Sequence, residues 1–154
     1  MSSIVSRHPF YDVCAIIWVI SFIGVLEIGW KHFWVVSMNL TAAFVLRKII
    51  QAKRPVEYDI RLQPSSDLAA DSFAFPSLES YMSVVITGHF VLYYQSFLLF
   101  LVACSLSLLV GVSRLYTKSR FPHQIVGSYF LGFIGLHISL HVCEKSEIHK
   151  YEIY

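Results

Sequence analysis

The longest uncharged stretch of the chain, residues 80–113, constrains the fold more than any other feature, because it contains no Asp, Glu, Lys or Arg. As one helix it would be about 50 Å long at about 1.5 Å per residue, whereas the hydrocarbon core of a bilayer is about 30 Å thick. We therefore expect the stretch to fold into a hairpin of two helices that turns near residues 93–96.

The composition of the whole chain excludes an ordinary soluble domain. Of its 154 residues, 56% are hydrophobic and only 14% are charged, whereas soluble domains average about 45–50% apolar and about 25% charged residues. The net charge of +2 is too small to indicate a nucleic-acid partner. Three cysteines without metal-ligand spacing give no reason to expect a metal or another cofactor.

Charged residues divide the rest of the chain into further apolar segments, and a polar, proline-containing loop separates the second segment from the third. The sequence thus predicts an all-α fold, a polytopic membrane bundle of about five transmembrane helices within a single membrane domain, residues 1–154. The expected helices are residues 11–30, 33–51, 78–94, 96–113 and 123–143.

Five crossings place both hydrophilic loops on one side of the membrane, together with the N-terminus. Nine of the 12 Lys and Arg residues fall on that side. The positive-inside rule alone would make it cytoplasmic, but arginines that serve a ligand would produce the same bias. We therefore expect an integral, multi-pass protein in contact with membrane lipids, and leave its orientation, compartment and oligomeric state open.

Three clusters of polar residues meet on that side of the membrane. They are residues 47–55, 75–80 and 113–124. Arg47 and Arg54 are two helical turns apart and lie on one helix face, Ser77 is suited to an N-cap, and Pro122 is suited to the first turn of a helix. Arginines beside the N–H groups of a helix start bind phosphate-like anions. The alternative interpretation is that these arginines only contact lipid headgroups.

The spacing within the clusters resembles the motifs of the type 2 phosphatidic acid phosphatase and vanadium haloperoxidase superfamily, over about residues 40–143. The first motif of that family is a lysine, six residues and then Arg-Pro, and here Arg47 is followed by six residues and Arg54-Pro55. The second is Pro-Ser-Gly-His, and here it reads Pro76-Ser77-Leu78-Glu79.

The third motif of the family is Ser-Arg, five residues, His, three residues and Asp. This chain has Ser113-Arg114, five residues, Arg120, three residues and Gln124. The order of the motifs and their places at helix ends also agree with the family. Family members usually have a six-helix core, so this chain looks one helix short at its N-terminus.

The resemblance implies that the phosphate-binding residues are retained and the catalytic residues are replaced. By position, the phosphate ligands are Arg47, Arg54, Ser77 and Arg114. The nucleophilic histidine is replaced by Arg120, its orienting aspartate by Gln124 and the acid histidine by Glu79. Arginine stays protonated and cannot attack phosphorus. We therefore expect a pseudoenzyme that binds or scaffolds a phosphorylated lipid headgroup without hydrolysing it.

Two other functions stay open at this point. An active lipid phosphate phosphatase would need His123 as a displaced nucleophile and Glu79 as a general acid with a raised pKa. A structural membrane protein would bind no ligand at the loop clusters. If Glu79 and Arg120 face each other as the two histidines of the family do, we also expect a structural ion pair between them that holds the loop to the third helix.

Three histidines lie within the apolar segments, and His137 and His141 are four residues apart on one helix face. That spacing suits a metal ion, but no third ligand is evident. We expect these two histidines and His89 to make interhelical hydrogen bonds instead.

Overall fold

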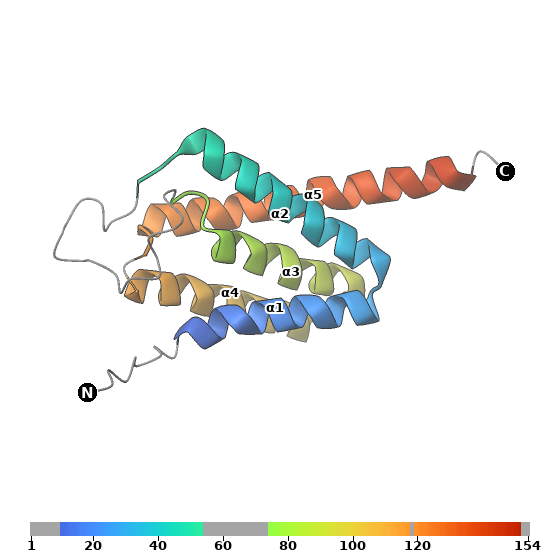
Figure 1. Ribbon diagram of the computed structural model, residues 1–154. Helices are drawn as coiled ribbons and strands as arrows, with labels where there is room; N and C mark the ends of the chain where they lie inside the picture. Colours follow the sequence, from blue (N-terminus) through green and yellow to red (C-terminus); the bar gives the residue numbers. More distant parts are fainter. Residues whose placement is uncertain (1–9, 54–73, 118, 152–154) are drawn as a thin grey trace, which may run out of the picture.

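The computed structural model describes residues 10–53, 74–117 and 119–151, and this part of the chain folds into helices without strands. The helices lie side by side in a bundle (Figure 1) and are α1 (Phe10–Glu27), α2 (Trp30–Ile50), α3 (Leu78–Tyr94), α4 (Phe97–Tyr116) and α5 (Pro122–Tyr151). The all-α fold and the order of the five expected helices are confirmed.

The expected hairpin in the long uncharged stretch forms at Gln95. This residue adopts a left-handed conformation with φ of 50°, and its backbone N–H donates to the Val91 carbonyl at 2.8 Å. That bond closes the last turn of α3, so α4 can start at Phe97 and run antiparallel to it. The break between α1 and α2 lies at Gly29, whose φ of 82° favours glycine.

Helix α5 is longer than its sequence predicted. The expected end was residue 143, where the charged tail begins, but the helix continues to Tyr151 and projects beyond the other helices (Figure 1). Residues 144–151 contain no proline or glycine, and charged residues such as glutamate and lysine are good helix formers in water. The charged residues therefore mark the end of the membrane-spanning segment, although the helix itself continues.

Helix α3 is the central helix, because it packs against each of the other four. It is buried on all sides over much of its length, and its buried residues include Tyr81, Met82, Val85 and Ile86. A helix without a solvent-facing side needs no amphipathic pattern. It also accepts Ser and Thr, whose hydroxyl groups bond to the carbonyl three or four residues earlier, as Ser83 and Thr87 do.

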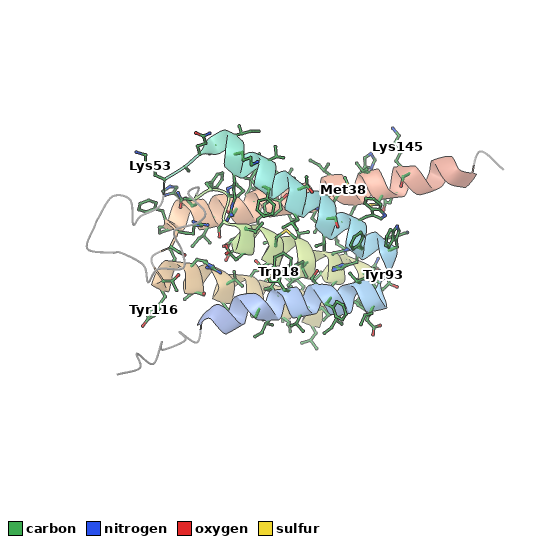
Figure 2. All side chains as sticks on the ribbon, in the orientation of Figure 1. Trp18, Met38, Lys53, Tyr93, Tyr116 and Lys145 are labelled. Atoms are coloured by element: carbon green, nitrogen blue, oxygen red, sulfur yellow. The ribbon has the colours of Figure 1, made fainter. Side chains whose placement is uncertain are left out.

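Within the part of the chain that the structure describes, three helices are long and apolar enough to cross a membrane: Trp30–Ile50, Phe97–Tyr116 and the Pro122–Ser146 part of α5. A shorter apolar helix spans Ala15–Glu27. Large apolar side chains cover the outside of the bundle, Phe97 and Leu98 being at least 70% exposed. Aromatic residues lie near both ends of the bundle, for example Tyr116 and Tyr93 (Figure 2), as expected at membrane interfaces. The chain is an integral membrane protein.

Besides the three polar clusters at the helix ends, a second set of polar residues lies inside the bundle, and we call it the mid-bundle network. Its members are His32, Asn39, Tyr81, His89 and Ser139. Tyr81 donates to Asn39 at 2.8 Å, and Asn39 donates to Ser139 at 2.9 Å, which links α3, α2 and α5. His32 and His89 form a hydrogen bond of 2.9 Å between their Nδ1 atoms. The interhelical hydrogen bond expected for His89 is therefore present.

Candidate functional site

The three polar clusters come together at one end of the bundle, as the sequence predicted. The backbone N–H of Ala74 donates to the Ala52 carbonyl at 2.7 Å. The Gln124 amide donates to the Lys53 carbonyl at 3.2 Å. These two bonds tie the end of α2 to the segment before α3 and to the first turn of α5. They therefore place the clusters against one another.

Arg47 joins the first cluster to the second. Its side chain is only 5% exposed in the last turn of α2, and its Nε donates to the Pro76 carbonyl at 2.9 Å. The guanidinium thus lies beside the segment that starts α3. Arg54, the other expected phosphate ligand of this cluster, lies outside the described residues.

Ser77 occupies the N-cap position of α3, as predicted, but its side chain makes no capping hydrogen bond. Its side chain is fully buried, and its hydroxyl lies 3.0 Å from that of Ser80. Its backbone N–H donates to the Ser128 hydroxyl at 2.7 Å. Ser128 was not among the expected site residues; it is one turn after Gln124, whose carbonyl its hydroxyl also contacts.

Glu79 lies in the first turn of α3, at the loop end of the bundle and outside the apolar spans. Its carboxylate forms an ion pair with Arg114 at 3.2 Å, and the Ser77 hydroxyl lies 3.5 Å from its other oxygen. The charges of Arg120 and Arg47 favour the ionised form of the same carboxylate. The ion pair expected between Glu79 and Arg120 is thus formed by Glu79 with Arg114, and Arg120 contributes through its charge. We call Arg47, Arg114 and Arg120 the arginine cluster.

The charge state of Glu79 follows from these neighbours. Burial alone would raise the pKa of its carboxyl group. Arg114, a hydrogen bond from the residue's own backbone, Arg120 and Arg47 together hold that pKa below the ordinary value of a glutamate. A general acid needs a pKa near the working pH. The arrangement therefore suits an anion held by arginines and does not suit an acid that protonates a leaving group.

Gln124 and Arg120 take part in contacts that hold the loops. Gln124 is 4% exposed; besides donating to Lys53, it accepts the Phe121 N–H at 3.1 Å, which caps the start of α5. Arg120 is 6% exposed and donates to the Ser119 carbonyl at 3.3 Å. The Gln124 carboxamide thus connects the segment after α2 to the start of α5. By the resemblance, this is the position of the orienting aspartate of the family.

His123 lies at the edge of the site. It is exposed and stacks on Phe121 with 5.5 Å between ring centroids. It also lines a hollow of about 460 Å³ together with Ala52, Lys53 and Gln124. This position leaves the imidazole accessible from the aqueous side.

The two histidines of α5 lie away from the arginine cluster. His137 and His141 are both exposed, and His137 packs edge-on against Phe133 at 4.5 Å. Among the described residues, no three His, Cys, Asp or Glu side chains gather closely enough to hold a metal ion.

Comparison with known proteins gives a consistent family. The model of the PAP2 superfamily matches residues 28–147. A similar solved structure is described as the first transmembrane PAP2 type phosphatidylglycerolphosphate phosphatase from Bacillus subtilis. It is 21% identical, the match covers 92% of this chain and 81% of that chain, and the TM-score is 0.63. No curated protein matches the sequence.

Proposed function

The chain belongs to the PAP2 superfamily, and we propose that it is a pseudoenzyme that binds the phosphate group of a membrane lipid without hydrolysing it. The observation that carries this proposal is the ion pair between Arg114 and Glu79 at 3.2 Å. The residues expected to bind phosphate already hold one anionic group, which is the carboxylate of the protein itself.

The charges at the site support binding of a further anion. Arg114 pairs with the Glu79 carboxylate, and the charges of Arg120 and Arg47 also stabilise that carboxylate, so three guanidinium groups act on one anionic group. Charge-assisted bonds from arginine to phosphate are short, strong and often bidentate. A lipid phosphate at the membrane surface is close to this end of the bundle, because Arg47 and Arg114 lie in the last turns of apolar helices and Arg120 lies in the loop after α4.

Two residue identities argue against hydrolysis. Arg120 occupies the position that resembles the nucleophilic histidine, and a protonated guanidinium has no lone pair to attack phosphorus. Glu79 occupies the position of the acid histidine, and its lowered pKa leaves it without a proton to donate at neutral pH. The resemblance thus assigns binding to the residues that remain and removes the nucleophilic attack on phosphorus and the proton transfer to the leaving group.

An assay of phosphate release tests this function. Purified full-length protein is incubated with phosphatidic acid and with an isoprenyl diphosphate, and we expect no release above the background of protein-free vesicles. The combined variant Glu79→His, Arg120→His, Gln124→Asp restores the residue types that the family motifs have at the three catalytic positions. If the site keeps the family geometry, this variant gains measurable hydrolysis.

Three results would contradict the proposal, each in a different way. Hydrolysis by the wild type that is lost in His123→Ala would show an active enzyme with a displaced nucleophile. Hydrolysis that survives in His123→Ala would show an active enzyme of another mechanism. Absence of phosphatidic acid binding to the wild type would show a structural protein without this ligand. For the measurement of phosphatidic acid binding, the matched control variant is Lys48→Ala, because Lys48 is an exposed cation next to Arg47.

A further inference from the structure

Two histidines from different helices meet inside the bundle, at the end opposite to the arginine cluster. His32 lies in the first turn of α2, and His89 lies about one turn before the end of α3. Tyr93 marks this end of the bundle in Figure 2, whereas Lys53 marks the end with the arginines. The Nδ1 atoms of the two imidazoles are 2.9 Å apart, and both side chains are buried. We call these two residues the histidine pair.

One nitrogen of the histidine pair indicates where the bridging proton lies. Among the described residues, Nε2 of His32 has no hydrogen-bond partner. It packs against α1, because a Cβ at Gly24 would lie 2.5 Å from it. A buried N–H without an acceptor is rarer than a buried acceptor without a donor, so we assign the lone pair to this nitrogen. His32 then donates its Nδ1–H to Nδ1 of His89, whose own proton is on Nε2.

With this arrangement, the histidine pair has no favourable place for a further proton. Nε2 of His32 is the one ring nitrogen of the pair with a lone pair that is not in use. A proton there would make an imidazolium whose N–H meets the α1 backbone at Gly24 and finds no acceptor. A buried charge without a partner is costly inside a membrane bundle. A proton on Nδ1 of His89 would instead break the hydrogen bond, because that atom is its acceptor.

The groups around the histidine pair do not compensate an added charge. Lys31 precedes His32 on α2, and its positive charge acts on His89. On α1, the carboxylate of Glu27 is exposed to the surroundings of the bundle. On α5, the titratable side chain that packs against the core is Cys143, and a neutral thiol is a weak acceptor. A further proton at the pair would thus add positive charge near a cation.

We propose that the histidine pair is a pH-sensitive latch, which holds α2 against α3 while both imidazoles are neutral and opens when either is protonated. The pair is within about two helical turns of the ends of α2 and α3, so protons reach it from the aqueous side opposite to the arginine cluster. Once separated, histidines have the ordinary pKa of about 6.5. The open form therefore binds more protons than the closed one, and acidification below that value favours it.

A nuclear magnetic resonance measurement on the wild type tests the latch directly. The protein is labelled with nitrogen-15 at histidine and held in detergent micelles. At about pH 7.5 we expect a scalar coupling between the Nδ1 atoms of His32 and His89 across their hydrogen bond, and we expect it to be lost at about pH 5.5. A coupling that persists at the lower pH would show that the pair stays closed in acid. Absence of the coupling at the higher pH would show that the rings share no proton. Either result overturns the proposal.

A variant without the titrating groups tests the energetic consequence. In His32→Asn, His89→Asn, two amide groups replace the imidazoles and can bond to each other at any pH. Between about pH 7.5 and pH 5.5, we expect the melting temperature of the wild type to fall by about 3 °C more than that of this variant. Equal falls in the two proteins would contradict the latch. If the variant does not fold, the coupling in the wild type still decides the question.

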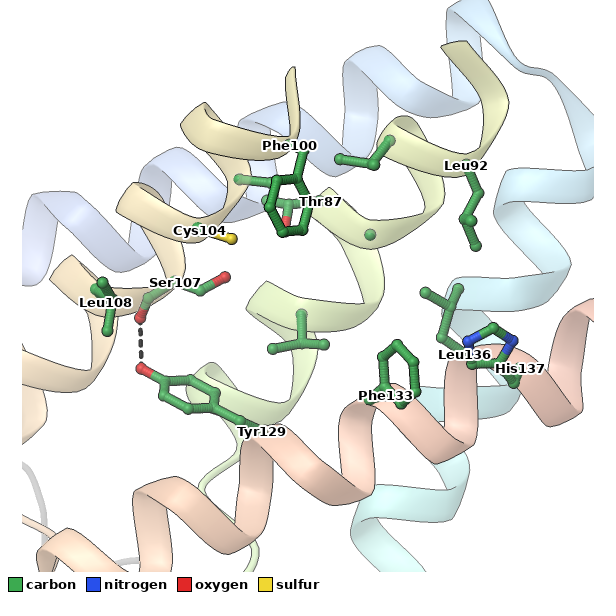
Figure 3. Close-up of a pocket in the computed structure, with 14 residues that line it drawn as sticks. Thr87, Leu92, Phe100, Cys104, Ser107, Leu108, Tyr129, Phe133, Leu136 and His137 are labelled. Atoms are coloured by element: carbon green, nitrogen blue, oxygen red, sulfur yellow. Dashed lines mark hydrogen bonds between the residues drawn. The ribbon is translucent and has the colours of Figure 1, made fainter. Parts of the chain in front are cut away.

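The matched control is another histidine. His137→Asn should keep the wild-type response to pH, since His137 is exposed on α5. It lines an apolar groove between α3, α4 and α5 to which the histidine pair does not contribute (Figure 3). A loss of the pH response in this control would show that the response does not come from the pair. The chosen range also excludes the ion pair of Glu79, whose carboxyl pKa lies below the ordinary glutamate value, so that ion pair stays intact throughout.

Discussion

The arginine cluster and the mid-bundle network are both buried polar regions of a membrane bundle, and they differ in how their charges and hydrogen bonds are satisfied. In the mid-bundle network, neutral groups bond to one another across helices, as Tyr81, Asn39 and Ser139 do. In the arginine cluster, one carboxylate faces three guanidinium groups. Neutral polar groups inside a membrane protein join helices, whereas buried ionisable groups are candidates for binding or catalysis. Under the proposed function, the mid-bundle network is structural and the arginine cluster binds the ligand.

The largest expected effect tests whether the stability of the protein depends on the close packing of α3 against α5. A Cβ at Gly132 would lie 2.7 Å from the Tyr81 carbonyl oxygen, which belongs to the α3 backbone. We expect Gly132→Val to destabilise the protein by about 3 kcal/mol, measured as a fall in melting temperature in detergent. Val126→Leu is the control, at an exposed position of the same helix. An unchanged melting temperature would show that α3 and α5 are less closely packed.

The second prediction concerns binding and isolates the arginine cluster. We expect Arg114→Ala to weaken phosphatidic acid binding about 10- to 100-fold, because it removes one charge-assisted contact to phosphate and leaves the Glu79 carboxylate to repel the ligand. Isothermal titration in phosphatidylcholine nanodiscs measures this. The exposed Lys48→Ala should change affinity less than twofold. Equal losses in both variants would mean that the arginines act only as surface charge, like any lipid-facing cation.

A smaller change in phosphatidic acid affinity is expected when Glu79 is replaced. This change strengthens binding, whereas Arg114→Ala weakens it. Its carboxylate occupies Arg114, so lipid phosphate has to compete with it. We expect Glu79→Gln, which keeps the shape and removes the charge, to bind phosphatidic acid about tenfold more tightly. Weaker binding would show that Glu79 orients the arginines for the ligand instead of competing with it.

The same variant also has a pH signature. The pKa of Glu79 is lowered in the folded protein, so the ion pair contributes its full stability above the ordinary glutamate pKa and loses it as the pH falls through the lowered value. Melting temperatures should therefore fall on acidification by a larger amount in the wild type than in Glu79→Gln. If the melting temperatures of the two proteins fall equally on acidification, the ion pair adds no net stability.

Much of this fold follows from the distribution of charge along the sequence. The turn near Gln95 and the start of α5 at Pro122 were predicted, because a bilayer limits helix length and proline suits a first helical turn. The full length of α5 does not follow from that distribution, since charge ends the apolar span of this helix, whereas the helix itself continues to Tyr151.

The site was predictable as far as residue spacing determines it. The convergence of Arg47, Ser77 and Arg114 was expected from their motif positions. The direct contact of Arg114 with Glu79 was not, because it depends on side-chain rotamers. The bond of His32 to His89 joins residues 57 positions apart, and periodicity within one helix carries no information on its partner.

The smallest predicted effect measures how much a hydrogen bond of the mid-bundle network contributes to the stability of the protein. Tyr81→Phe removes the hydroxyl that donates to Asn39 at 2.8 Å and leaves the ring packed in the core. Interhelical hydrogen bonds in membrane proteins average about 0.6 kcal/mol, so the melting temperature should fall slightly and phosphatidic acid affinity should not change. Asn39 keeps its bond to Ser139, which limits the loss. If Tyr81→Phe altered lipid affinity as much as Arg114→Ala, the two polar regions would be coupled, and the division into a structural and a functional region would not hold.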